Sequence, residues 1–227
     1  MRKRIIFCCL AGLIAATAGE LESARDRQDR AALEKLANDV GAAAAKSPDD
    51  ANAQYRAALA FSYLAEVTQE LRDKGAAKRA AESGIRHAER AIALKPSNGE
   101  YHRILGTLCG QVIPANVLAG LSYGKQAQTE VGKAIELDPK SPRAYVSRGV
   151  GNYYLPEAFG GGAANAIRDF QKAIGLDPKS GEAHLWLGLA LRKSNRNGEA
   201  RKAFEKSLQL NPNRVWTKQQ LDKTPTQ

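Results

Sequence analysis

The stretch AIELDPKS at residues 134–141 occurs again as AIGLDPKS at residues 173–180, with a single residue changed. Related stretches stand at residues 91–98 (AIALKPSN) and 207–214 (SLQLNPNR). Proline biases the residue before it away from helical backbone angles, so each copy predicts the end of a helix. These ends fall at Pro96, Pro139, Pro178 and Pro212. A chain that repeats its own helix terminator is typical of an array of repeated helical units.

The same stretch also predicts where the next helix begins. Ser141 can accept hydrogen bonds from the free amide groups of a first turn, and Pro142 fits the first helical position, where no backbone N–H is needed. Each copy therefore indicates a short connection between two helices.

The N-terminal residues have the pattern of a secretory signal. Residues 1–4 (MRKR) are basic, residues 5–15 are mostly apolar, and Ala16-Thr17-Ala18 has the small residues that a signal peptidase accepts. The apolar run is shorter than the ~20 residues that span a bilayer, which favours a cleaved signal over a retained anchor. We therefore expect residues 1–18 to be removed and the mature protein to be periplasmic or secreted, in a bacterium.

The net charge bears on the class of partner, and the cysteine count bears on disulfide formation. The formal net charge is +10, and removing residues 1–18, which hold three basic residues and no acidic ones, leaves 31 − 24 = +7. Because no dense Lys/Arg cluster is present, nucleic acid is not expected as a partner, whereas an acidic protein segment is possible. Cys8 and Cys9 leave with the signal, so Cys109 cannot form an intramolecular disulfide and is expected to be a small buried residue.

The last repeat has the length and the key residues of a known family. Pro178 and Pro212 are 34 residues apart, and small or apolar residues stand at fixed distances before the second proline: Leu187, Gly188, Ala200, Phe204 and Ser207. In this respect the chain resembles the tetratricopeptide repeat (TPR) family, whose 34-residue unit is a pair of antiparallel helices. The unit before it matches at Gly149, Ala166, Phe170, Ala173 and Pro178, and the one before that at Leu105, Gly106, Ala127, Ala134 and Pro139.

The resemblance implies an all-α fold, an α-solenoid of antiparallel helix pairs in which Gly and Ala let two helices cross closely. We expect four units, at residues 51–98, 99–141, 142–180 and 181–212, of which the first has two lengthened helices over 53–72 and 76–94. Extra residues fall at 113–122, where Pro114 could begin a short helix with Val117, Leu118 and Leu121, and at 155–162 (LPEAFGGG). A capping helix or partial repeat is expected within 19–50, centred on 30–46, and a C-terminal capping helix over 214–223, followed by a frayed tail.

The resemblance also implies a non-enzymatic scaffold that binds a protein or peptide in a concave groove lined by the first helix of each pair. The candidate partner-binding residues on that face are Tyr55, Arg56, Tyr63, Arg103, Gln111, Arg143, Tyr153, Tyr154, Trp186 and Arg192, with Ser62, Thr107, Ser147 and Lys193 beside them. Tyr, Trp and Arg are the residues that most often anchor binding interfaces. The alternative is that the tyrosines pack between units and the arginines face water.

Two departures from the family pattern bear on function. Chaperone-binding members hold a partner's C-terminal carboxylate with Lys and Asn, but the matching positions here are Val146, Ser147, Val150, Leu185, Trp186 and Leu189, so that activity is not supported. Arg148 stands where the family normally has Leu, so either that unit is rotated slightly or the guanidinium bridges to a carboxylate such as that of Glu157 or Asp169.

Signs of catalysis, metal or cofactor binding are weak. His87, His102 and His184 lie in different units without a metal-ligand spacing, no G-x-S-x-G pattern is present, and the three glycines at 160–162 lack the Lys and Ser/Thr of a phosphate-binding loop. We expect no enzyme activity, no metal and no cofactor. The alternative function is a periplasmic, transporter-associated or other small-ligand binding protein of helical-repeat type, which would need a closed pocket near Pro114 and Phe159.

Overall fold

The structure is a computed structural model that describes residues 17–115 and 120–226. Within these ranges the chain forms eleven α-helices and two short 3-10 helices, without a strand. The helices of the first half are α1 (Ala18–Asp26), α2 (Arg30–Lys46), α3 (Ala51–Glu70), α4 (Lys74–Leu94), α5 (Gly99–Val112) and α6 (Gly120–Leu137). Those of the second half are α7 (Pro142–Tyr154), α8 (Ala163–Leu176), α9 (Gly181–Lys193), α10 (Asn197–Leu210) and α11 (Val215–Asp222).

The recurring proline stretch ends one helix and caps the next, as predicted. The four prolines each follow a helix end by two residues, since α4, α6, α8 and α10 end at Leu94, Leu137, Leu176 and Leu210. Ser141 accepts a hydrogen bond from the Ala144 amide at the start of α7, with Pro142 at the first helical position. Asn98 and Ser180 cap α5 and α9 in the same manner. Side-chain caps of this kind stabilise a helix by about 1 kcal/mol each.

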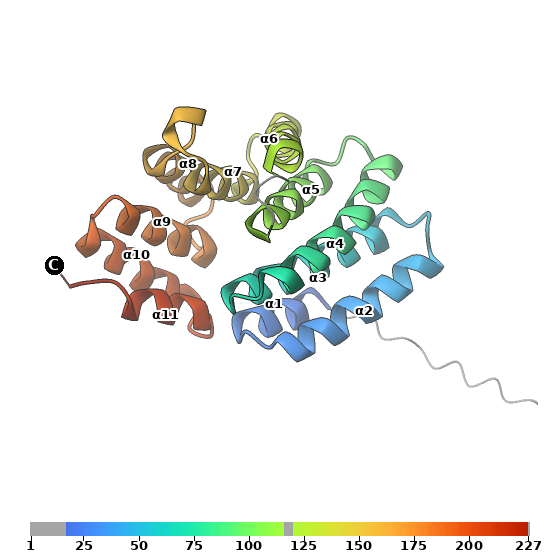
Figure 1. Ribbon diagram of the computed structural model, residues 1–227, viewed down its shortest axis with the longest axis horizontal. Helices are drawn as coiled ribbons and strands as arrows, with labels where there is room; N and C mark the ends of the chain where they lie inside the picture. Colours follow the sequence, from blue (N-terminus) through green and yellow to red (C-terminus); the bar gives the residue numbers. More distant parts are fainter. Residues whose placement is uncertain (1–16, 116–119, 227) are drawn as a thin grey trace, which may run out of the picture.

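The helices stack as antiparallel pairs around an arc (Figure 1). Successive first helices contact one another, α3 with α5, α5 with α7 and α7 with α9, and we take this series as the inner side of the arc. Helices α6 and α8 lie toward its outer edge. The all-α solenoid predicted from the repeats is therefore confirmed. The arc bends far enough to bring its two ends together, because α11 lies beside α1 and the end of α3.

Small residues allow the two helices of a pair to approach closely. A Cβ atom added to Gly188 in α9 would lie 2.6 Å from the Phe204 ring of α10, and one added to Gly149 in α7 would lie 2.5 Å from the Phe170 ring of α8. Both phenylalanines are fully buried. A glycine-aromatic contact thus forms the seam of the last two pairs, whereas in the pair of α5 and α6 Gly106 lies against Val131.

The irregular segments fall where the sequence places its extra residues. Residues 155–162 form a compact turn that includes the 3-10 helix η3 (Glu157–Phe159), in which Gly160 and Gly162 have φ of +83° and +96°. Such angles favour glycine. The 3-10 helix η1 (Ile113–Ala115) follows α5, and the predicted short helix with Val117, Leu118 and Leu121 falls largely outside the described residues.

The two ends of the chain differ from expectation. Helix α1 was not predicted, and it begins with a capping box between Thr17 and Glu20, so the expected cleavage after Ala18 falls at its first helical residue. Residues 1–16 lie outside the described part of the chain. The prediction of a frayed C-terminal tail was wrong at Thr224, which is buried. Its hydroxyl accepts a hydrogen bond from Arg192 and donates one to the Gln220 carbonyl.

Cys109 is a free, fully buried thiol in α5, which confirms its expected structural role. No helix among those described is both long and apolar enough to cross a membrane.

Candidate partner-binding surface

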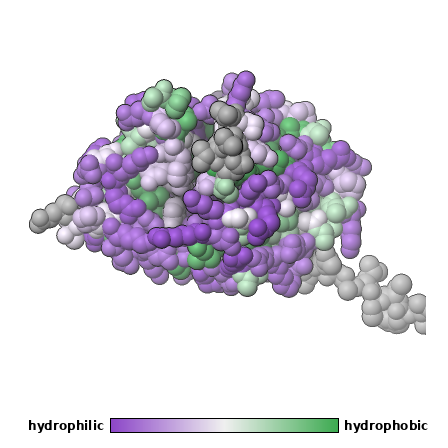
Figure 2. Space-filling view, viewed as in Figure 1, coloured by the Kyte–Doolittle hydropathy of each residue, from purple (hydrophilic) through white to green (hydrophobic). Residues whose placement is uncertain are grey.

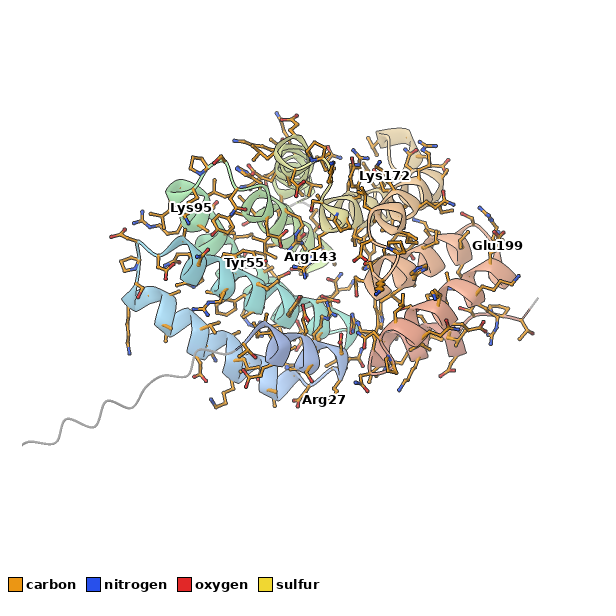
Figure 3. The ribbon with its side chains drawn as sticks, turned by 180° about the vertical axis from the view of Figure 1, so that it is seen from behind. Arg27, Tyr55, Lys95, Arg143, Lys172 and Glu199 are labelled. Atoms are coloured by element: carbon orange, nitrogen blue, oxygen red, sulfur yellow. The ribbon has the colours of Figure 1, made fainter. Side chains whose placement is uncertain are left out.

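The inner side of the arc is the candidate partner-binding surface, which we call the inner wall and which is formed by α1, α3, α5, α7, α9 and α11. In Figure 3, Tyr55 and Arg143 lie on this side, whereas Lys95, Lys172 and Glu199 lie at the outer edge. The face seen in Figure 2 is mostly hydrophilic, with apolar residues in separate small areas.

Tyr55 and Arg103 are held together by Glu100. The Tyr55 hydroxyl donates a hydrogen bond to Glu100 Oε1 at 2.8 Å, and Arg103 donates two to the same carboxylate at 2.7 and 2.8 Å. The Arg103 side chain is only 10% exposed. Burial raises the pKa of the Tyr55 hydroxyl, and the neighbouring Glu100 charge adds to that shift. These two predicted groove residues therefore join α3 to α5.

Hydrogen bonds between hydroxyl and amide side chains also connect successive inner helices. Thr107 and Ser147 are 3.0 Å apart through their hydroxyl oxygens, and Gln111 contacts both the side chain and the backbone carbonyl of Ser62. Ser62, Gln111, Thr107 and Ser147 thus contribute to the packing of the units rather than to a free surface.

Arg143 remains accessible on the inner wall. Its side chain is 58% exposed and lies 3.8 Å from a Glu22 oxygen and 3.7 Å from a Glu100 oxygen. Ion pairs at this separation and exposure contribute little to stability, so the guanidinium can exchange one partner for another at small cost. Arg56 is likewise exposed, on α3.

Four aromatic side chains from three inner helices meet near the C-terminal end of α7. We call them the aromatic cluster (Tyr153, Tyr154, Trp186 and Trp216). Trp186 is at its centre, with ring centroids 5.9, 6.2 and 5.4 Å from those of Tyr153, Tyr154 and Trp216. The rings meet edge to face, an arrangement that aromatic pairs prefer. Trp186 is buried, and Tyr153 is partly buried, with the Lys193 ammonium 4.6 Å from its ring centre.

Tyr154 is the exposed member of the aromatic cluster. It is 57% exposed, one of the few large apolar side chains described that are open to water. Loss of solvation nevertheless raises the pKa of its hydroxyl to about 12, with smaller contributions from Tyr153 and Glu70. Tyr154 is therefore accessible but has protein on several sides, as a residue on the inner side of an arc would be.

Two further predicted partner-binding residues, Tyr63 and Arg192, make contacts within the protein instead of facing a partner. Tyr63 is buried with the Arg25 guanidinium 4.9 Å from its ring centre. Arg192 turns toward the C-terminal cap, where it donates to the side chain and carbonyl of Gln220. Of the ten predicted partner-binding residues, Arg56, Arg143 and Tyr154 are exposed, and the others are buried or partly buried.

A group of charged side chains that the sequence did not predict lies where the two ends of the arc meet. We call it the closing cluster (Arg25, Asp26, Glu66, Glu70, Glu182 and Arg214). Arg214 is 1% exposed, and its guanidinium donates to Glu66 and Glu70 of α3, each at 2.5 Å. Its Nε atom has no hydrogen-bond partner among the described residues, although oxygens of Asp26 and Glu182 lie 3.9 Å away.

The closing cluster holds more carboxylates than guanidiniums, namely four against two. Desolvation, together with the charges of Glu182 and Glu70, raises the pKa of Glu66 to about 8, even though Arg214 and Arg25 oppose the shift. Burial also raises the pKa of Glu70. A proton on one of these carboxyl groups relieves the excess negative charge.

Features of a metal site or a ligand pocket are few among the described residues. None of their His, Cys, Asp and Glu side chains gather in groups of three or more that could hold a metal ion. His102 is buried between Glu130 and the Pro96 carbonyl, and His87 contacts Gln54. Two shallow surface hollows lie between α4 and α6 and among α8, α9 and α10, and neither includes Phe159, which is 74% exposed.

Sequence comparison identifies the family. The family described as regulator of microtubule dynamics protein 1-3 matches residues 14–157, which are 144 of the 227 residues. The chain belongs to this family. A tetratricopeptide-repeat family matches residues 159–215, so the TPR resemblance is confirmed. No curated protein matches the chain in sequence.

Solved structures show the same fold at low identity. A thermophilic TPR protein of Thermus thermophilus has a TM-score of 0.62 and 16% identity, over 90% of this chain and 96% of that one. The HusA haemophore of Porphyromonas gingivalis has a TM-score of 0.59 and 20% identity, over 79% of this chain and 96% of that one. TPR-type helical-repeat proteins are generally scaffolds that bind peptides or proteins, and no catalytic family is indicated.

Proposed function

We propose that this protein is a non-enzymatic scaffold that binds a segment of a partner protein along the inner wall. The observation that carries the proposal is Tyr154, which is 57% exposed on the inner side of the arc and supported from beneath by Tyr153 and Trp186. A rigid, accessible aromatic ring over a packed base is typical of an interface anchor. Arg143 adds an accessible guanidinium on the same helix.

Fewer arginines are available to an acidic partner segment than the sequence indicates. Arg103 is satisfied by Glu100 within the chain, so it does not attract an acidic segment. Arg56 and Arg143 are the accessible cations of the predicted set, and they can pair with acidic residues of a partner.

We further propose that the protein acts in the bacterial envelope. The support is the basic start, the apolar run and the small residues at 16–18. Cleavage after Ala18 would remove the Thr17 cap of α1, so the mass of the mature protein bears on both localisation and the α1 terminus. Fractionation of cells with intact-mass analysis tests this. A full-length mass in the cytoplasmic fraction would contradict it.

A site-specific crosslinking experiment tests the partner surface. A photoreactive phenylalanine derivative replaces Tyr154 in one variant and Phe159 in a matched control, because Phe159 is an aromatic residue 74% exposed on the η3 turn. We expect a protein adduct from the Tyr154 variant that is weakened by Arg143→Glu, and none of that mass from the control. The same adduct from Phe159 alone would overturn the assignment. A thermal-shift response to small molecules without any adduct would instead favour the small-ligand alternative.

A further inference from the structure

Arg214 departs from the repeat pattern at a position with a known structural role. In the four copies of the proline stretch, the residue two places after proline is Asn98, Ser141, Ser180 and Arg214. The first three cap the helix that follows, each with a side-chain hydrogen bond. Arg214 occupies the same place before α11 and makes no such bond. The last repeat has therefore exchanged a helix cap for an arginine.

This exchange has a local cost at the start of α11. A missing Ser or Asn cap destabilises a helix by about 1 kcal/mol, and α11 has only eight residues. Moreover, the Arg214 side chain is 1% exposed, and burying a guanidinium is unfavourable unless carboxylates compensate it. A residue that is unfavourable for its own helix has to be stabilised by contacts with other parts of the chain.

The side-chain hydrogen bonds of Arg214 reach the opposite end of the solenoid, whereas near its own end Glu182 lies 3.9 Å from its Nε and the Trp216 ring centre lies 5.5 Å from its guanidinium. Arg214 donates to Glu66 and Glu70, which are 148 and 144 residues away, and its Nη1 atom lies 3.5 Å from the Arg25 carbonyl oxygen. Two further bonds join the same ends: Asn211 donates to Asp26 at 2.8 Å and Gln219 donates to Gln28 at 3.0 Å. The junction is thus polar and charged, centred on one buried guanidinium.

A polar junction of this kind differs from the seams within the pairs. The helix pairs are joined by fully buried rings such as Phe170 and Phe204, whereas the two ends are joined by ion pairs and hydrogen bonds. Hydrogen bonds and ion pairs can be exchanged for contacts with water or with a partner at a smaller cost than opening an apolar core. The junction is therefore the place where the closed arc can open without unfolding its units.

We propose that Arg214 is a latch that holds the two ends of the solenoid together, and that its release opens the arc while the helix pairs stay intact. The consequence for binding rests on the proposed function: opening the latch separates α11 from α1 and α3 and widens access to the inner wall, where Tyr154 lies. A partner segment that presents its own arginine to Glu66 and Glu70 can compete with Arg214 for the closed position.

The repeat itself supplies the test variant. Arg214→Ser removes the guanidinium but restores the residue type that caps α7 and α9, so α11 gains a cap as the latch is lost. Arg196→Ser is the matched control, because Arg196 stands at the same position before α10 and pairs only locally, with Glu199 three residues on. Spin labels at Lys35 on α2 and Lys218 on α11, both exposed, report the distance between the ends.

The expected result is a longer and broader distance distribution for Arg214→Ser, with helix content by circular dichroism equal to that of the unsubstituted protein. Arg196→Ser should keep the narrow distribution. An unchanged distribution in a folded Arg214→Ser protein would overturn the proposal. If that variant loses its helix content, the combined Asn211→Ala and Gln219→Ala variant is used instead, because it retains Arg214. We expect it to broaden the distance distribution partially. Loss of the helix pairs together with the junction would refute a separable latch.

This experiment is independent of the partner. It is performed on the isolated protein, so it stands even if crosslinking through Tyr154 fails. If the arc opens but the yield of the Tyr154 adduct stays the same in Arg214→Ser, the latch exists and does not control the inner wall.

Discussion

Arg148 of α7 donates hydrogen bonds to both carboxylate oxygens of Asp169 in α8, at distances of 2.6 to 3.1 Å. The Asp169 side chain is only 8% exposed, whereas that of Arg148 is 46% exposed. Asn152 donates a further bond to the same carboxylate. Related repeats have an apolar residue at the position of Arg148. Here the arginine forms an ion pair between the two helices of a pair, which is one of the two arrangements that the sequence left open.

Removing one partner of this pair should cost more than replacing both. Arg148→Leu leaves the carboxylate of Asp169 buried with Asn152 alone, and we expect a loss of roughly 1–3 kcal/mol in the free energy of unfolding. The combined Arg148→Leu and Asp169→Leu variant should recover part of that loss, since no buried charge remains. Urea unfolding of the single and double variants measures this as a double-mutant cycle. Strict additivity would show that the pair is not coupled.

Two glycines in α7 should respond oppositely to the same substitution. A Cβ at Gly149 would lie 2.5 Å from the Phe170 ring, so Gly149→Ala should destabilise the protein by roughly 1–3 kcal/mol. Gly151 has no atom within 4 Å of such a Cβ, so Gly151→Ala should stabilise α7 by about 0.5–1 kcal/mol. Thermal unfolding of both variants gives the signs. Equal effects would refute the close approach of α7 and α8.

The raised pKa of Glu66 predicts how stability changes with pH. Desolvation, with Glu182 and Glu70 nearby, raises this pKa to about 8, whereas Arg214 and Arg25 lower it less than burial raises it. The folded protein then holds a proton that the unfolded chain releases above a pKa near 4.5. The stabilisation is complete below that value and is lost as pH rises through about 8, by up to roughly 1.4 kcal/mol per pH unit within the window.

Glu66→Gln should therefore flatten the pH dependence of the free energy of unfolding between pH 5 and pH 8, and should be more stable than the unsubstituted protein at the upper end. The amide keeps a hydrogen-bond acceptor for Arg214 without a charge. Glu199→Gln is the control, since the pKa of this exposed carboxyl is lowered and the group therefore titrates below pH 5. A slope that Glu66→Gln leaves unchanged would show that Glu66 is ionised in the folded state throughout.

Cys109 should be unreactive in the folded protein. It is fully buried, and desolvation raises the pKa of its thiol to about 12, so the thiolate that attacks disulfide reagents is scarce at neutral pH. In a protein that lacks residues 1–18, we expect labelling by a thiol reagent only upon unfolding in denaturant, with one thiol per chain. Rapid labelling in native buffer would mean that α5 opens easily.

The repeat pattern predicted the helix pairs because the same physical demands recur in each unit. Proline and a cap mark every connection, and Gly188 with Phe204 shows the close crossing that small residues permit. Helix α1 was not predicted because its sequence is polar, with Leu21 and Ala24 as its buried apolar residues. A short polar helix has little periodicity to recognise, and its packing on α2 and α3 and its contacts with the C-terminal end stabilise it.

The candidate site was harder to predict, since a helix face does not reveal which residues meet across units. Trp186 and Tyr154 lie on neighbouring inner helices, yet one is buried and the other exposed, according to how the units are rotated. The contacts of Arg214 join residues more than 140 positions apart, which no local period encodes. The available signal was the exception in the fourth proline stretch, where an arginine replaces Asn or Ser.

Contact between α11 and the first helices changes how such an array loses its structure. A linear stack of repeats has two terminal units, each with one neighbour, and it unravels from these termini in steps. Here Arg214 gives the last unit a second neighbour, so fraying at either terminus has to break the same junction. The protein should consequently melt as one cooperative block while the ends are joined, and in stages once they are parted.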